Sequence, residues 1–267
     1  MEIPKNYLEV NKATWNEKTT VHVLSDFYDM EGFINGKSSL KDIELQLLGN
    51  ISGLKVLHLQ CHFGQDSISL AKLGAEVTGV DLSDKAIGKA IEIAEKMNVP
   101  VQFICSDVYD LPNQLHEKFD IVFTTYGTIG WLPDLDKWAK VVSHFLKPNG
   151  KFVFAEFHPV VWIFDEHFKN IQYSYFNVET VIENTEGTYA DKEASIKNQT
   201  VSWNHPLTEV FSSLLQNGLE IKSFNEYDYS PYACFNGLEE FEPGRYRIQH
   251  LENKIPMVYS LVATKKT

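Results

Sequence analysis

The stretch that decides the fold runs from Lys55 to Asp81 and reads KVLHLQCHFGQDSISLAKLGAEVTGVD. An apolar run is followed by a turn that ends in Gly64, then by a segment with helical spacing, and then by a second apolar run. A glycine between an apolar run and a helical segment permits a sharp backbone turn. This order of strand, turn, helix and strand predicts a βαβ unit with parallel strands.

The same alternation continues to about residue 156, which favours one parallel α/β sheet. Strands are expected at residues 55–60, 76–81, 101–105, 119–124 and 151–156. Helices are expected between them at residues 65–73, 83–97 and 135–145. Ser83 is a suitable N-cap for the second of these helices, and Asn98 and Pro100 are suited to end it.

The segments on either side of this core do not continue the alternation of strands and helices. Residues 1–50 are expected to form an N-terminal helical cap, with one helix at 40–48, before the core at 51–157. Residues 158–205 are expected to form an insertion over the substrate site, and 173–201 are rich enough in Thr, Val and Tyr to predict a hairpin or small sheet. Residues 206–267 are expected to complete the sheet with a helix at 206–217 and strands at 219–229 and 257–264.

Composition restricts the classes of partner. Lys and Arg number 24 against 36 Asp and Glu, which gives a formal net charge of −12. Such a charge repels polyanions, so neither a nucleic acid nor an anionic membrane is an expected partner. Cys61, Cys105 and Cys234 contain no C-x-x-C pair, which predicts neither a disulfide framework nor a metal site. With no apolar leader and no membrane-length apolar run visible, we expect a reduced, cytoplasmic protein.

Candidate binding residues follow the first three expected strands, where open parallel sheets bind their ligands. The turn from Gln60 to Gly64 leads into a helix and offers backbone N–H groups to an anion. Asp81 ends the second strand, where a carboxylate can accept hydrogen bonds from a ribose diol. Asp107 follows the third strand, where an acidic side chain can meet an adenine amino group.

These residues together resemble the class I S-adenosylmethionine-dependent methyltransferases. The usual first motif of that family, D/E-x-G-x-G-x-G, falls here on His58, Gln60, His62 and Gly64, so only the last glycine is present. Residues 57–64 resemble a group of these enzymes whose first motif reads L-H-L-Q-C-H-F-G. The resemblance extends over about residues 54–157. It includes Asp81 as the acidic ribose ligand, Asp107 and Val108 as the pair beside the adenine, and a turn at 146–150 that is similar to L-K-P-G-G.

The resemblance implies a Rossmann-like fold with a seven-stranded, mostly parallel sheet, helices on both faces, an N-terminal helical cap and a β-rich insertion after the fifth strand. It implies S-adenosylmethionine as cofactor and S-adenosylhomocysteine as product. In the family, N-terminal segments close over the cofactor, which here suggests Tyr28 or Trp15 as a contact. The implied cofactor-binding residues are Gln60, Cys61, His62, Gly64, Asp81, Leu82, Asp107, Val108, Thr125 and Tyr28.

The altered first motif leaves two interpretations. Either Gln60 or His62 contacts the cofactor carboxylate in a variant loop, or the loop no longer binds the cofactor. A nicotinamide dehydrogenase is disfavoured, because the glycine positions of G-x-G-x-x-G are occupied by Gln60, His62 and Gln65.

The expected reaction is methyl transfer by direct displacement to a small, aromatic or apolar acceptor at oxygen, nitrogen or carbon. His158, which follows the fifth strand, is the candidate base, with Tyr126 as a second catalytic candidate. Trp131, Trp162 and His205 are candidate substrate-binding residues. Two alternatives stay open: a non-catalytic protein that binds S-adenosylmethionine or S-adenosylhomocysteine, and a methyltransferase acting on protein or RNA.

Overall fold

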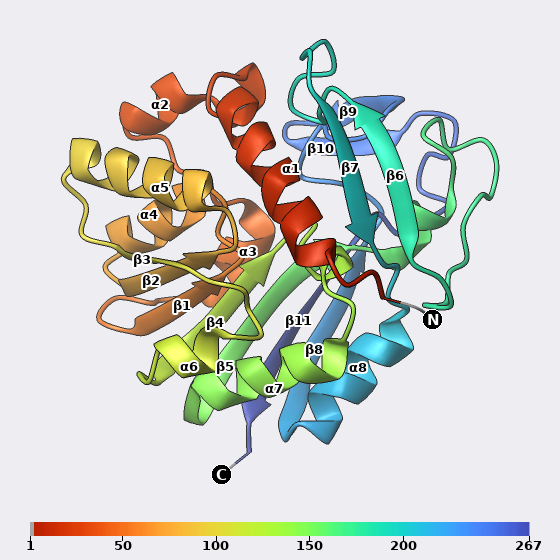
Figure 1. Ribbon diagram of the computed structural model, residues 1–267. Helices are drawn as coiled ribbons and strands as arrows, with labels where there is room; N and C mark the ends of the chain where they lie inside the picture. Colours follow the sequence, from red (N-terminus) through yellow and green to blue (C-terminus); the bar gives the residue numbers. More distant parts are fainter. Residues whose placement is uncertain (1–2, 267) are drawn as a thin grey trace.

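The computed structural model describes residues 3–266, which form a central sheet covered by helices on both faces (Figure 1). The strands in sheet order are β3 (Gln102–Cys105), β2 (Glu76–Asp81), β1 (Lys55–Leu59), β4 (Phe119–Thr125), β5 (Leu146–Phe157), β11 (Val258–Lys265) and β8 (Leu219–Tyr227). The first five are mutually parallel, whereas β11 is antiparallel to both β5 and β8. The predicted seven-stranded, mostly parallel sheet is therefore confirmed.

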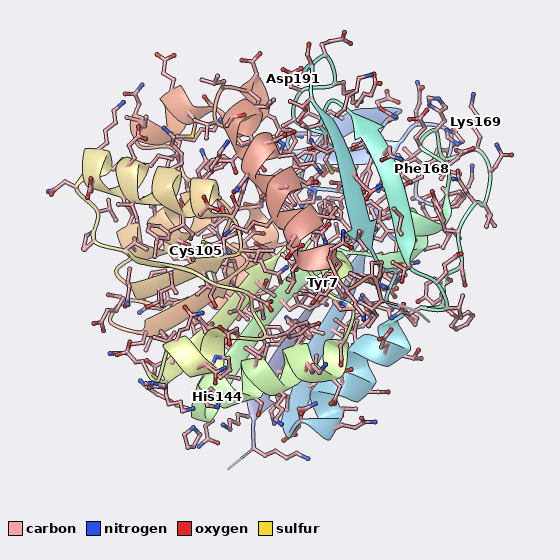
Figure 2. All side chains as sticks on the ribbon, viewed as in Figure 1. Tyr7, Cys105, His144, Phe168, Lys169 and Asp191 are labelled. Atoms are coloured by element: carbon pink, nitrogen blue, oxygen red, sulfur yellow. The ribbon has the colours of Figure 1, made fainter. Side chains whose placement is uncertain are left out.

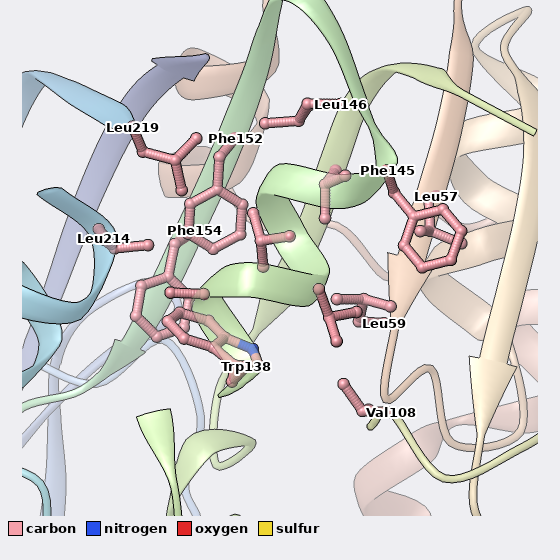
Figure 3. Packing of buried hydrophobic residues seen from close by; sticks show 14 of the residues in the cluster. Leu57, Leu59, Val108, Trp138, Phe145, Leu146, Phe152, Phe154, Leu214 and Leu219 are labelled. Carbon is pink, nitrogen blue, oxygen red and sulfur yellow. The ribbon is translucent and has the colours of Figure 1, made fainter. Parts of the chain in front are cut away.

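Alternating side chains of the buried strands form two separate cores, because successive strand residues point to opposite faces. Leu57 and Leu59 pack with Trp138 and Phe154 under the helices α6 (Leu111–Gln114), α7 (Leu135–Phe145) and α8 (Leu207–Gln216) (Figure 3). Val56 packs on the other face, against α3 (Asp42–Leu48) and α4 (Gln65–Lys72). The helix α5 (Asp84–Met97) lies beside α4 on that second face and contacts β2 and β3.

Two distant segments lie side by side over the carboxyl ends of the parallel strands (Figure 1). One is α1 (Tyr7–His22), which is followed by η1 (Asp26–Tyr28) and α2 (Met30–Ile34). The other is the hairpin of β6 (Val181–Glu186) and β7 (Lys197–Ser202). Asn11 holds them together by exchanging two hydrogen bonds with the Val201 backbone, at 2.8 and 3.0 Å. Tyr7, at the start of α1 in Figure 2, adds an edge-to-face contact with Trp203 at 5.5 Å.

Some elements differ from the sequence-based expectation. β5 begins at Leu146 rather than near residue 151, with Asn149 in a left-handed conformation at φ 62°. A second hairpin, β9 (Leu238–Glu242) with β10 (Arg245–Ile248), was not anticipated, because of its residues only Ile248 is buried and no apolar alternation marks it. The short helices η2 (Ile129–Trp131) and η3 (Pro159–Ile163) have too few residues for a periodic signal. Within residues 3–266, none of the helices combines the length and apolarity needed to cross a bilayer.

Candidate functional site

A cavity of about 980 Å³ lies at the carboxyl ends of the strands, under α1 and the β6–β7 hairpin. All the residues predicted to bind the cofactor line it, together with Tyr126, Trp131, Trp162 and His205. Pockets for one drug-sized ligand measure about 300–1,000 Å³. The volume is therefore large enough for an adenosyl cofactor and a second small molecule.

The turn after β1 keeps the backbone of a glycine-rich loop although it holds one glycine. Gln60, His62 and Gly64 all adopt left-handed conformations, with φ of 56°, 51° and 79°. A Cβ atom on Gly64 would lie 2.7 Å from Cζ of Phe103 and 2.9 Å from Cβ of Ala90, so this position has no room for a side chain. The other two side chains line the cavity instead, at the backbone cost that left-handed non-glycine residues carry.

Asp81 connects this turn to the end of β2. Its Oδ2 accepts a hydrogen bond from His62 N at 2.8 Å, and its Oδ1 accepts one from Ser83 N at 2.9 Å. Burial raises the pKa of Asp81 to about 6, and these backbone hydrogen bonds oppose the rise. Each carboxylate oxygen retains a further lone pair for a ligand, so Asp81 is suited to accept from ribose hydroxyls.

Two buried polar atoms of the turn have no partner within residues 3–266, namely Gln60 Oε1 and His62 Nε2. The amide nitrogen of Gln60 is already used, since it donates to Thr128 O at 2.8 Å. Buried polar atoms are normally hydrogen-bonded, so a free acceptor beside a free ring nitrogen fits a ligand with both donors and acceptors. The amino-acid end of S-adenosylmethionine is such a group, so the residues present fit this cofactor.

Glu156 organises the loop after β4 and was missed by the sequence analysis. Its carboxylate is 3% exposed and accepts from the backbone N–H groups of Gly127, Thr128, Ile129 and Phe157, as well as from the Thr128 hydroxyl. These bonds hold the segment that carries Tyr126 and Trp131. The available sequence signal was an acidic residue inside the otherwise apolar run FVFAEF.

Tyr126 faces the cavity with a strained backbone, at φ 39°, and donates from its hydroxyl to Glu44 Oε2 at 2.8 Å. Glu44 also accepts from Lys41 N at 2.9 Å and is fully buried. Burial, and then the charge of Asp66, raise the pKa of Glu44 to about 8. Glu44 could not be recognised from the sequence, because its spacing indicates only a position on a helix.

This perturbed carboxyl predicts a pH-dependent stability. Glu44 has an ordinary pKa of 4.5 when unfolded, so its contribution to stability is complete below 4.5 and is lost as the pH rises through about 8. Glu44→Gln removes the titration, and we expect the melting temperature of the wild type to fall relative to this variant between about pH 5 and pH 8. Thermal unfolding across that range, with the exposed Glu95→Gln as control, measures the difference. Parallel curves for wild type and Glu44→Gln would contradict the assignment.

The structure does not bring His158 to the cavity. Its Nδ1 accepts from Val160 N at 3.2 Å and caps η3, while its Nε2 lies 3.0 Å from Glu226 Oε1. Burial lowers the pKa of His158. The ring lies toward Glu226 of β8, and His158 is not among the residues that line the cavity. The predicted base at His158 therefore has no support in this geometry.

The residues predicted to bind the methyl acceptor line the cavity, but they make different contacts. Trp131 donates from Nε1 to Gly127 O at 2.8 Å, and Trp162 lies at the rim with 42% of its surface exposed. His205 has both ring nitrogens engaged, with Leu132 O at 2.8 Å and Glu209 Oε2 at 3.0 Å. These contacts favour a positioning role for His205 over contact with a substrate.

The N-terminal cap supplies aromatic side chains to the cofactor side of the cavity. Trp15 and Tyr28 contact His62 with ring centroids 5.2 and 5.5 Å apart. The Tyr28 hydroxyl is 2.5 Å from that of Tyr189, which precedes β7. The cap and the insertion thus meet across the cavity, and a contact of Trp15 or Tyr28 with the cofactor stays a prediction.

Comparisons with known proteins place the chain in a family. Residues 50–211 match the family described as a methyltransferase domain. The chain is 35% identical over 134 residues to the uncharacterized methyltransferase sll0829 of Synechocystis, covering 49% of this chain and 60% of that protein. It is 35% identical over 116 residues to the ubiquinone biosynthesis O-methyltransferase of Coxiella burnetii, covering 43% of this chain and 48% of that protein. The chain thus spans about half the length of these relatives.

A solved structure of an S-adenosylmethionine-dependent methyltransferase from Listeria monocytogenes has the same fold. The TM-score is 0.58 at 22% identity, and the match covers 83% of this chain and 95% of that one. The strand order, the turn geometry after β1 and the family match agree with one another. The chain belongs to the class I S-adenosylmethionine-dependent methyltransferase family.

Proposed function

We propose that this chain transfers the methyl group of S-adenosylmethionine to a small-molecule acceptor by direct displacement. The observation that carries the proposal is one cavity in which the turn after β1 and a wall of aromatic side chains adjoin. Displacement at a sulfonium methyl needs an aligned nucleophile and a dry site more than it needs protein nucleophiles. The cofactor, when bound, supplies the activated methyl group.

The first three strand ends would hold the cofactor. Asp81 accepts from the ribose hydroxyls, and Asp107 with Val108 contacts the adenine. Gln60 Oε1 and His62 Nε2 contact the amino-acid end, because they are the unpartnered polar atoms of the turn. Of the two interpretations of the altered motif, the preserved left-handed backbone favours the variant binding loop.

The remaining wall favours an aromatic or apolar acceptor. Phe157, Trp162 and Phe235 form a cluster of edge-to-face contacts with ring centroids 5.0–5.9 Å apart. We assign Tyr126 and Glu44 to a proton released by the acceptor only when Glu44 is ionised, that is as the pH rises through about 8, since the Tyr126 hydroxyl reaches both the cavity and the carboxyl. The net charge of −12 opposes a nucleic-acid acceptor.

Calorimetric titration with S-adenosylhomocysteine tests the cofactor site. We expect Asp81→Asn to weaken binding at least about 10-fold, because hydrogen bonds to a charged carboxylate contribute about 1.5–3 kcal/mol. The matched control is Asp84→Asn, a surface carboxylate that pairs with Lys12 at 3.0 Å. Equal affinities of wild type and Asp81→Asn would contradict the proposed site.

Turnover separates an enzyme from a binding protein. The relative named as an O-methyltransferase makes phenols and other hydroxyl compounds the first acceptors to test. Methyl transfer is measured as the formation of S-adenosylhomocysteine from S-adenosylmethionine across this panel of acceptors. The Tyr126→Phe variant is assayed beside the wild type. Tight cofactor binding without release across the panel would favour the non-catalytic alternative.

A further inference from the structure

Lys18 of α1 is a buried cation that lines the cavity. Its residue is 8% exposed, and no salt bridge or hydrogen bond within residues 3–266 involves its ammonium group. The Nζ atom instead lies over two tryptophan rings, 5.1 Å from the centroid of Trp15 and 5.3 Å from that of Trp131. Cation–π contacts offset only part of the cost of removing an ammonium from water.

The groups around Lys18 add further unpaired nitrogens. Among residues 3–266, the fully buried His22 finds no partner for either ring nitrogen, and His62 finds none for Nε2. The two imidazole centroids are 5.2 Å apart. Burial and the charge of Lys18 lower the pKa of His22 to about 3, and burial lowers that of His62 as well, so both rings are neutral. His62 and Lys18 line this corner of the cavity, with His22 buried behind them, so the corner presents a cation and a neutral imidazole that can donate, which suits an oxyanion.

The position of Lys18 points to the acceptor rather than to the cofactor. Trp131, on which it packs, belongs to η2 after β4, and the adjoining Gly130 O accepts from Trp203 N beside β7 at 2.9 Å. The acidic side chain that interacts with Lys18 is Glu183 of β6. Lys18 thus extends from α1 toward η2 and the insertion, next to the cofactor residue His62, whereas Asp81 and Asp107 lie farther along the sheet edge, at the ends of β2 and β3.

We propose that Lys18 is a specificity-determining residue that binds a carboxylate group of the methyl acceptor. The inference rests on the proposed function and narrows its substrate class to small aromatic or apolar acids. The carboxylate would lie against Nζ with the apolar part of the acceptor between the two tryptophans and the aromatic wall. An unpaired lysine in this place costs stability, and a charged ligand explains why the cavity contains it.

Binding of probe acids to the protein saturated with S-adenosylhomocysteine tests the proposal. The probes are benzoate and indole-3-acetate, each compared with its neutral amide, and binding is followed by calorimetry and by tryptophan fluorescence. We expect at least one acid to bind more tightly than its amide, and Lys18→Met to weaken that acid about 10- to 100-fold with little effect on the amide. Lys18→Arg should retain the preference for the acid.

The matched control is Lys37→Met. Lys37 also lines the cavity, but its ammonium is paired with Asp29 at 2.7 Å. Lys18→Met should melt at the same temperature as the wild type or higher, because it removes an unpaired buried charge. A clear loss of stability would indicate a structural role for Lys18 and overturn the proposal.

The pH dependence gives a readout that packing alone would not produce. Burial lowers the pKa of Lys18 to about 8, while the charge of Glu183 opposes the shift; His62 in the cavity lining and the buried His22 are the neighbouring neutral groups. Acid binding by the wild type should therefore weaken as the pH rises through about 8, and that dependence should be absent in Lys18→Met. A pH-independent preference for the acid in the wild type would contradict the proposal.

A second pair of ligands tests whether Lys18 binds the carboxylate of the methyl acceptor or the carboxylate of the cofactor. S-adenosylhomocysteine has an amino-acid carboxylate, and 5′-methylthioadenosine does not. If Lys18→Met weakens only the first, Lys18 binds the cofactor and the proposal is wrong. No preference for acid over amide in either probe pair, including no binding at all, also overturns it. Failure of the proposed function itself would be seen separately, as wild-type protein that does not bind S-adenosylhomocysteine.

Discussion

Gly64→Ala is expected to lower the free energy of unfolding by about 2–5 kcal/mol, which corresponds to a melting temperature lower by about 5–15 °C. Two costs add at this position. The backbone is left-handed at φ 79°, and a Cβ atom would press against Phe103 and Ala90 at 2.7 and 2.9 Å. Gly64 is also the N-cap residue of α4 and the last residue of the turn that contains His62. Cofactor binding should therefore weaken as the turn shifts. Thermal unfolding and titration with S-adenosylhomocysteine measure both effects.

Gly218→Ala is a matched control. Gly218 has the same φ of 79°, but apart from its chain neighbours no atom of residues 3–266 lies within 4 Å of its added Cβ atom, so we expect the backbone cost of about 1–2 kcal/mol alone. Replacing Phe103 with a smaller side chain should restore part of the stability of Gly64→Ala, since Phe103 supplies the shortest contact. Equal losses for Gly64→Ala and Gly218→Ala would show that the close contact is unimportant.

Glu156→Gln is expected to cost about 2–4 kcal/mol of stability although the two side chains have nearly the same shape. Both carboxylate oxygens accept hydrogen bonds, Oε1 from Gly127 N and Phe157 N, and Oε2 from Thr128 and Ile129 N. Glutamine has one oxygen, so its amide group would face backbone donors and leave them unsatisfied. The loop carrying Tyr126 should then move, and methyl transfer should fall together with stability.

Glu44→Gln provides the comparison for Glu156→Gln. Both glutamates are buried, but within the described part of the chain Glu44 accepts only from Lys41 N and the Tyr126 hydroxyl. At neutral pH we expect Glu44→Gln to lower the free energy of unfolding clearly less than Glu156→Gln does, because the raised pKa of Glu44 keeps its carboxyl protonated there. Denaturant unfolding of both variants at pH 7 measures the difference, and equal losses would show that the number of donors at Glu156 does not determine its effect.

Much of the core could be predicted from local sequence patterns. The period-two and helical spacings between Lys55 and Asp81 depend on near neighbours along the chain, and the structure has the expected strand, turn, helix and strand. The seven-stranded, mostly parallel sheet came from the family resemblance and is confirmed, whereas the strand order and the antiparallel direction of β11 were not predicted. The β9–β10 hairpin escaped prediction because it is exposed and buries little apolar surface.

The residues of the candidate site could also be predicted only in part. Asp81 and Gly64 were predictable because each stands next to a strand end in the sequence, and a parallel sheet places strand ends on one edge. His158 also follows a strand, yet its side chain lies outside the cavity, since the alternation of β5 and the pairing with β11 decide which way it points. Position next to a strand end therefore identified the right edge of the sheet but not the orientation of each side chain.

Spacings of a few residues were enough to predict the α/β class, the turn after β1 and the acidic residues at the strand ends. Packing of distant segments brings Glu44 to Tyr126, lets Glu156 hold the loop after β4, and sets Lys18 over Trp15 and Trp131 without a salt-bridge partner within residues 3–266. Asn11 and Val201 are 190 positions apart, and their contact joins α1 to β7 beside the cavity. Such pairs arise from packing of distant segments, which no local periodicity encodes.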